Sequence, residues 1–84
     1  MFMHIVDEFK KYLTKELEKV DSFSERATNI RKIQNHFSDS QLEDCIRTYL
    51  YVLGEQDFET YIRLLLMQRQ NDLGETDVEG IGYN

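Results

Sequence analysis

The chain has 84 residues, a formal net charge of −6, 40% hydrophobic residues and no proline. That length suits one domain with a single core, and the apolar content is too high for an intrinsically disordered chain. Residues 1–36 carry seven basic and six acidic groups, whereas residues 37–84 carry three and ten. An acidic surface disfavours non-specific binding of nucleic acids or membranes, which depends on lysine and arginine. It permits a protein partner with a basic surface.

The first predicted helix covers residues 2–20. Its apolar side chains recur at three- and four-residue steps, the spacing of one helix face; they are Phe2, Ile5, Val6, Phe9, Leu13, Leu17 and Val20. The opposite face carries lysines toward the C-terminal end, where the helix dipole favours cations. We interpret this charged face as solvated, with a binding stripe for an acidic partner as the alternative.

The second predicted helix covers residues 24–37 and follows a polar break. Ser22 and Glu25 form a capping-box pattern, and Ser24 offers a second cap. The side chains expected to face inward are Ala27, Ile30, Ile33 and Phe37. Arg26 falls near this apolar side, so we expect its aliphatic stem to lie along the core edge while its guanidinium reaches water.

The third and fourth predicted helices, residues 41–53 and 57–73, hold the densest apolar content of the chain. Gly54 can adopt the left-handed conformation that ends a helix, and Asp57 can cap the next one. We expect these two helices to fold back on each other. The broad apolar band of the fourth helix, centred on Leu65, places it in the middle of the domain.

These patterns predict an all-α fold. Residues 1–74 are expected to form a small four-helix, bundle-like domain with short connections and roughly antiparallel neighbours. Gly74 is well placed to end the fourth helix. Residues 75–84 are acidic, contain two further glycines and lack a helical period, so we expect them to form a flexible tail.

Cys45 is the single cysteine, so no disulfide can form within the chain and a reducing compartment is favoured. It shares a helix face with Leu42 and Ile46, where a thiol is expected to be buried and inert. The N-terminal segment lacks the basic start and long apolar run of a signal peptide. No segment approaches the ~18 apolar residues of a membrane span. We therefore expect a cytoplasmic protein.

No catalytic, cofactor or metal-binding motif is recognisable. Only His4 and His36 could exchange protons near neutral pH, and neither lies in a nucleophile motif. His4 could project with Asp7 and Glu8 from adjacent helical turns, but no histidine or cysteine pair completes a metal site. We therefore expect neither an enzyme nor a requirement for a cofactor or metal.

A DNA-binding regulator is the alternative function. The second predicted helix carries Arg26, Asn29, Arg31 and Lys32, a set suited to phosphates and base edges. The net charge has the wrong sign for this function, and acids of the next helix approach the same end of the molecule. Nucleic acid is therefore the less favoured partner.

Two apolar residues lie on the wrong side of their helices. Tyr51 and Met67 each fall opposite the centre of an apolar band, and both residue types are enriched at interfaces. Single exposed apolar residues are also common on ordinary surfaces. With Asp44, Glu55 and Glu59 nearby as a polar rim, the pattern predicts a non-enzymatic protein-interaction module. It would be a small acidic regulator or inhibitor that binds a partner protein's surface, and a homodimer is its simplest form.

Overall fold

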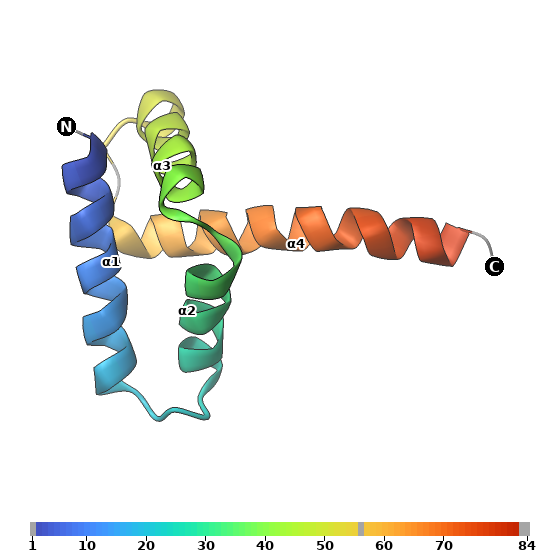
Figure 1. The fold of residues 1–84 in the computed structure, drawn as a ribbon, viewed down its shortest axis with the longest axis horizontal. Helices are drawn as coiled ribbons and strands as arrows, with labels where there is room; N and C mark the ends of the chain where they lie inside the picture. The colour runs from blue at the N-terminus through green and yellow to red at the C-terminus, as the bar shows by residue number, and fades with distance from the viewer. Residues whose placement is uncertain (1, 56, 83–84) are drawn as a thin grey trace.

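The computed structural model describes the backbone of residues 2–55 and 57–82 and the side chains of residues 4–55 and 57–73. Four helices account for nearly all of it: α1 (Phe2–Lys19), α2 (Glu25–His36), α3 (Asp39–Leu53) and α4 (Phe58–Gly82) (Figure 1). Every regular element in the described residues is a helix, so the all-α, four-helix prediction is confirmed.

Short polar sequences set the helix ends. Ser24 caps α2 by accepting a hydrogen bond from the backbone N–H of Ala27 at 3.1 Å, so the cap is Ser24 and not Ser22. Ser38 and Gln41 form a complete capping box, which starts α3 at Asp39, earlier than predicted. Gly54 ends α3 with a φ of 79°, a conformation that side chains disfavour.

The helices do not form a simple up-and-down bundle. α1 runs antiparallel to α2 and α3, which follow one another along its length, and α4 crosses them (Figure 1). α1 packs most extensively against α3 and α2 against α4, whereas contacts between α3 and α4 are fewer. The predicted antiparallel packing therefore holds for α1 and α2. It is wrong for α3 and α4, because the segment after Gly54 redirects the chain across the domain.

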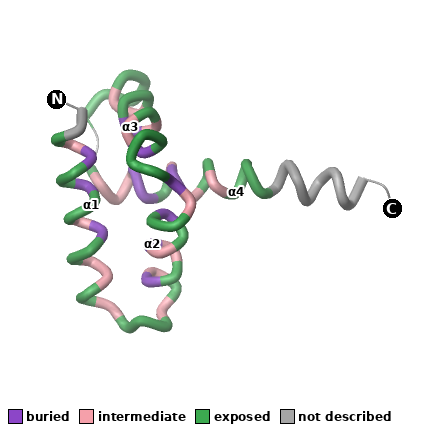
Figure 2. The backbone as a smooth tube through the Cα atoms, in the orientation of Figure 1, coloured by how far each residue is buried: buried purple, intermediate pink, exposed green. Residues whose placement is uncertain are grey.

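The core lies where α4 crosses the other helices (Figure 2). Phe9 of α1 meets the rings of Phe58 and Tyr61 edge-on, at centroid distances of 5.4 and 6.1 Å. Such edge-to-face pairs contribute about 0.5–1.5 kcal/mol beyond the burial of their area. Leu65 is completely buried in the same cluster as Ile30, which confirms the predicted central position of the fourth helix.

α4 continues to Gly82, beyond the end predicted at residue 73. A glycine inside a helix costs only about 1 kcal/mol relative to alanine, so Gly74 does not compel the helix to stop. The side chains from residue 74 onward, and residues 83–84 altogether, lie outside the described part of the chain. The flexible acidic tail expected over residues 75–84 falls there and stays a prediction.

Candidate functional site

Arg26 joins three helices through its guanidinium group. Its Nη1 donates to Oε1 of Glu59 at 3.1 Å, and its Nη2 donates to Oε1 of Glu16 at 3.0 Å. The hydroxyl of Tyr12 donates to the other oxygen of the Glu59 carboxylate. The Arg26 side chain stays 33% exposed, but its guanidinium is bound by carboxylates and does not extend freely into water. It is held between a carboxylate of α1 and a carboxylate of α4.

The charges of this network stabilise one another. Hydrogen bonds from Arg26 and then from Tyr12 lower the pKa of Glu59, and the bond to Glu59 is the main cause that raises the pKa of Arg26. The hydrogen bond to the Glu59 carboxylate, followed by burial, raises the pKa of Tyr12 to about 12. Arg26 and Glu59 are thus both charged at neutral pH, and their partly exposed ion pair joins α2 to α4.

α3 ends in consecutive exposed apolar side chains, which we name the α3 tip: Tyr51, Val52 and Leu53. Their exposed fractions are 90%, 68% and 45%. Tyr51 lies on the side of α3 opposite the buried Leu42 and Ile46, as the helical spacing predicts. The exposed carboxylate-bearing residues Asp44 and Glu55 belong to the same helix and to the segment after it.

The other predicted partner-binding residues lie elsewhere. Met67 is 61% exposed, but it belongs to α4, which crosses α3 and does not extend beside it. Glu59 is bound by Arg26 and Tyr12. Of the predicted set, Tyr51, Asp44 and Glu55 therefore share α3 or its end, while Met67 and Glu59 have separate surroundings.

Sequence reasoning missed Val52 and Leu53 as surface residues. Helical periodicity assigns Leu53 to the inward band together with Tyr49 and Leu50. The last turn of α3 nevertheless leaves Leu53 nearly half exposed. The signal that could have identified the tip is the run of three apolar residues directly before the helix-ending Gly54.

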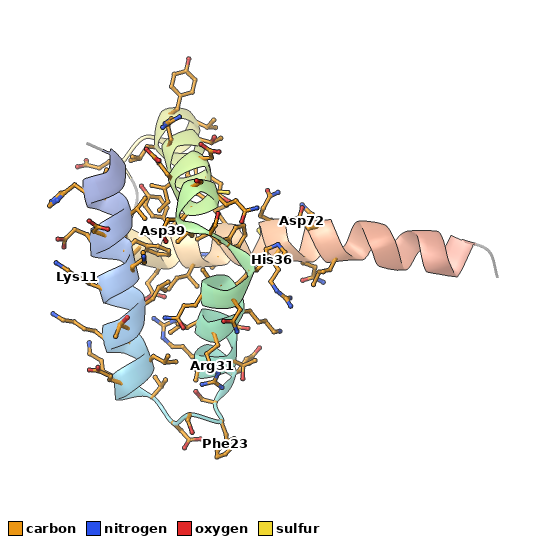
Figure 3. The ribbon with its side chains drawn as sticks, viewed as in Figure 1. Lys11, Phe23, Arg31, His36, Asp39 and Asp72 are labelled. Atoms are coloured by element: carbon orange, nitrogen blue, oxygen red, sulfur yellow. The ribbon has the colours of Figure 1, made fainter. Side chains whose placement is uncertain are left out.

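A surface groove runs between α2 and α4, beside the place where these two helices pack against each other. It consists of two hollows of about 500 and 310 Å³ that share Lys32 and Arg69 as lining residues, and we name it the α2–α4 groove. Arg31 lines the smaller hollow, and Leu66 and Leu73 line the larger one. Where the end of α2 meets α4, Nε2 of His36 lies 3.1 Å from Oδ2 of Asp72 (Figure 3).

The residues considered for DNA binding divide between two places. Asn29, Arg31 and Lys32 line the α2–α4 groove, and Arg31 also donates to the backbone carbonyl of Ser22 at 2.7 Å. Arg26 faces the opposite way, into the network with Glu16 and Glu59. Lys32 lines both hollows, Asn29 only the larger one and Arg31 only the smaller one, while Arg26 lines neither.

The remaining chemically reactive residues form no further cluster. Cys45 is half-buried, and burial is the main cause that raises the pKa of its thiol. His4 is exposed on α1. Among the described residues, no group of three or more His, Cys, Asp or Glu side chains could hold a metal ion. Nor does any helix of the described chain have the length and apolarity needed to cross a membrane.

No family model, curated protein or solved structure matches this chain. The side chains of the α3 tip and of the α2–α4 groove are therefore the only indication of what each surface binds. The tip is apolar and is bordered by acids, whereas the groove is lined by cations.

Proposed function

We propose that this chain is a non-enzymatic protein-interaction module, an acidic regulator or inhibitor that occupies the surface of a partner protein through the α3 tip. The observation that carries this proposal is the 90% exposed ring of Tyr51, followed directly by the exposed Val52 and Leu53. Burying such side chains against a partner is favourable, by roughly 25 cal/mol for each Å² of apolar surface before the costs of association. The three residues share the last turn of α3, so a partner that encloses this helix end can bury all of them.

The charge around the tip favours a partner with a basic rim. Asp44 and Glu55 are exposed on α3 and just after it. Arg47 is the single cation of α3, and it lies 3.2 Å from Glu43 and 3.9 Å from Asp44, so Asp44 is partly neutralised and Glu55 is the stronger rim charge. A second copy of this chain would bring the same acids together across a two-fold axis, and like charges at an interface oppose association. We therefore favour a foreign protein that has an apolar pocket bordered by lysine or arginine, over a homodimer.

The tip is part of a regular helix before any partner binds. Leu42 and Ile46 anchor α3 in the core, and the backbone N–H of Gly54 closes the last turn by donating to the carbonyl of Leu50 at 2.9 Å. A preformed helix end loses little conformational entropy on binding, so more of the gain from apolar burial contributes to affinity.

The test compares Tyr51→Ala with Phe23→Ala. Phe23 is a matched control because its ring is 91% exposed in the connection between α1 and α2, away from α3. Immobilised wild type and both variants are incubated with lysate, and the retained proteins are quantified by mass spectrometry. We expect a partner that is retained by wild type and Phe23→Ala but lost with Tyr51→Ala. Equal retention of every protein by all three would contradict the proposal.

Self-association is measured on the same proteins by sedimentation velocity across a range of concentrations. We expect wild type to remain monomeric. A dimer that is abolished by Tyr51→Ala and kept by Phe23→Ala would replace the foreign partner with a second copy of the chain.

DNA binding through α2 is the second candidate, and one observation favours it: Lys32 lines both hollows beside α2, with Asn29 in one of them and Arg31 in the other. Arg31 and Lys32 are the only cations of this set that can neutralise phosphates, because Arg26 is paired with Glu16 and Glu59. Fluorescence anisotropy with a random duplex at low salt tests this candidate. Binding that weakens with salt and is lost in Lys32→Ala would support it.

A further inference from the structure

The α2–α4 groove gathers positive charge on an acidic protein. Arg31, Lys32 and Arg69 line its two hollows, although the whole chain carries a net charge of −6. Neither Lys32 nor Arg69 forms an ion pair with any residue in the described part of the chain. By contrast, Lys10 pairs with a carboxylate elsewhere on the surface. The groove therefore offers cations that an external anion can neutralise.

Apolar and amide groups complement these cations. Leu66 and the exposed Leu73 line the larger hollow, and its volume of about 500 Å³ lies within the usual range of ligand pockets. Asn29 and Gln70 contribute side-chain amides to the same hollow, and each can both donate and accept a hydrogen bond. This combination can take an apolar side chain, its peptide backbone and flanking carboxylates together.

An ion pair and a histidine–carboxylate contact join α2 to α4. The pair between Arg26 and Glu59 joins the first turns of α2 and α4, and the pair between His36 and Asp72 joins the end of α2 to a later part of α4 (Figure 3). Because α2 and α4 are joined at two places and pack against each other, the groove exists without a ligand. A preformed groove lowers the entropic cost of binding.

We infer that the α2–α4 groove is a second binding site, which takes an acidic polypeptide segment that carries an apolar side chain. That the occupant is a polypeptide rests on the proposed function; the location and the charge of the site do not. A nucleic acid fits less well, because its phosphate backbone is charged at every nucleotide and cannot avoid Glu25 in the groove and Asp72 at its edge, whereas a peptide can place single carboxylates beside Lys32 and Arg69. These acids interrupt the track of cations that a phosphate backbone requires, and nucleic acid makes no use of Leu73.

Fluorescence anisotropy with defined peptides tests the inference on the full chain. The probe is a short fluorescein-labelled peptide that repeats Glu-Glu-Leu. Control peptides repeat Gln-Gln-Leu, which removes the charge, and Glu-Glu-Ser, which removes the apolar side chain. We expect the Glu-Glu-Leu peptide to bind at least about fivefold more tightly than either control, because the groove supplies both cations and leucines.

Charge-reversal variants locate the site. Lys32→Glu and Arg69→Glu should each weaken binding of the Glu-Glu-Leu peptide by about fivefold or more, since each places a carboxylate against those of the peptide. Lys11→Glu is the matched control, because Lys11 is an equally charged, exposed residue on α1. It should change the affinity by less than about twofold. Circular dichroism establishes that every variant is folded, and amide NMR shifts on titration should concentrate at Asn29, Lys32 and Arg69.

The results that would overturn the groove inference differ from those that would overturn the proposed function of the α3 tip. An equal loss in Lys11→Glu, or no binding of the peptide by wild type, would overturn the inference. So would tighter binding of random duplex DNA than of the peptide, with the same dependence on Lys32 and Arg69. Tyr51→Ala should leave the peptide affinity unchanged. If it abolished peptide binding, the peptide would occupy the α3 tip, and the groove inference would fail while the proposed function stood.

Discussion

The Arg26 guanidinium and the Glu59 carboxylate join the first turn of α2 to the first turn of α4, with Nη1 3.1 Å from Oε1. The two residues are 33 positions apart in the sequence. Glu16 of α1 accepts a further hydrogen bond from Arg26 at 3.0 Å, and Tyr12 donates to Glu59. One side chain of α2 thus connects the helix that precedes it with the helix that crosses it.

Replacement of Arg26 by methionine should destabilise the fold by about 1–2 kcal/mol. The change keeps most of the aliphatic stem but leaves the partly buried carboxylates without their cation. Lys10→Met is the control, because the pair between Lys10 and Asp39 is exposed and such pairs contribute at most about 1 kcal/mol. Urea denaturation of wild type and both variants measures the difference. Equal midpoints for Arg26→Met and wild type would show that the network contributes no stability.

Leu65→Ala should destabilise the protein by about 2–5 kcal/mol, because it removes a completely buried side chain and leaves a cavity at the crossing of α4. A chain of this length has a total stability of roughly 4–12 kcal/mol, so much of the variant could be unfolded at room temperature. Leu73→Ala, at an exposed position of the same helix, should have little effect. A thermal melt of Leu65→Ala close to that of wild type would contradict the central position of α4.

Stability should fall at both extremes of pH. Hydrogen bonds from Lys19 and Arg26 lower the pKa of Glu16, and bonds from Arg26 and Tyr12 lower that of Glu59. The stabilisation from these carboxylates is complete above their ordinary value of 4.5 and is lost as the pH falls through the lowered values. The midpoint of thermal unfolding should therefore decrease below about pH 4.5. A midpoint that stays constant under acid would contradict the network.

The raised pKa of Tyr12 predicts how the stability of the fold changes at alkaline pH. Its pKa is raised from 10.0 to about 12, so its contribution is complete below pH 10 and is lost as the pH rises toward 12. Burial also raises the pKa of Tyr61, so more than one tyrosine resists ionisation. Tyr12→Phe should therefore reduce the alkaline loss of stability without abolishing it. Ultraviolet titration should show one fewer high-pKa tyrosine in this variant than in wild type.

Local periodicity was sufficient to predict the four helices and most of their buried faces, although not all of their ends. Phe9, Ile30 and Leu65 are buried where the spacing placed them, because a helix face depends on residues three and four positions apart. The direction of α4 could not be predicted in this way, since it depends on contacts with distant helices. The same limit applies to Arg26, because periodicity identified its position near the core edge but not its carboxylate partners.

The same contrast between local properties and contacts of distant helices applies to the two candidate surfaces. Tyr51 could be predicted to be exposed, since its place opposite the apolar band of α3 is a local property. The α2–α4 groove could not, because Lys32 and Arg69 come together only when α4 crosses α2. The grouping of Tyr51 with Met67 assumed a helical hairpin, and the crossing of α3 by α4 removes the basis for it.

Site-specific photocrosslinking tests the central proposal most directly, that the α3 tip contacts a partner protein. The photoreactive residue p-benzoylphenylalanine is incorporated in place of Tyr51, and in a second protein in place of Phe23, at two almost fully exposed aromatic positions on different parts of the fold. Irradiation in cells should yield a discrete crosslinked protein from position 51 and none of that mass from position 23. Identical crosslinking patterns from the two positions, or no crosslink from position 51, would contradict the proposal.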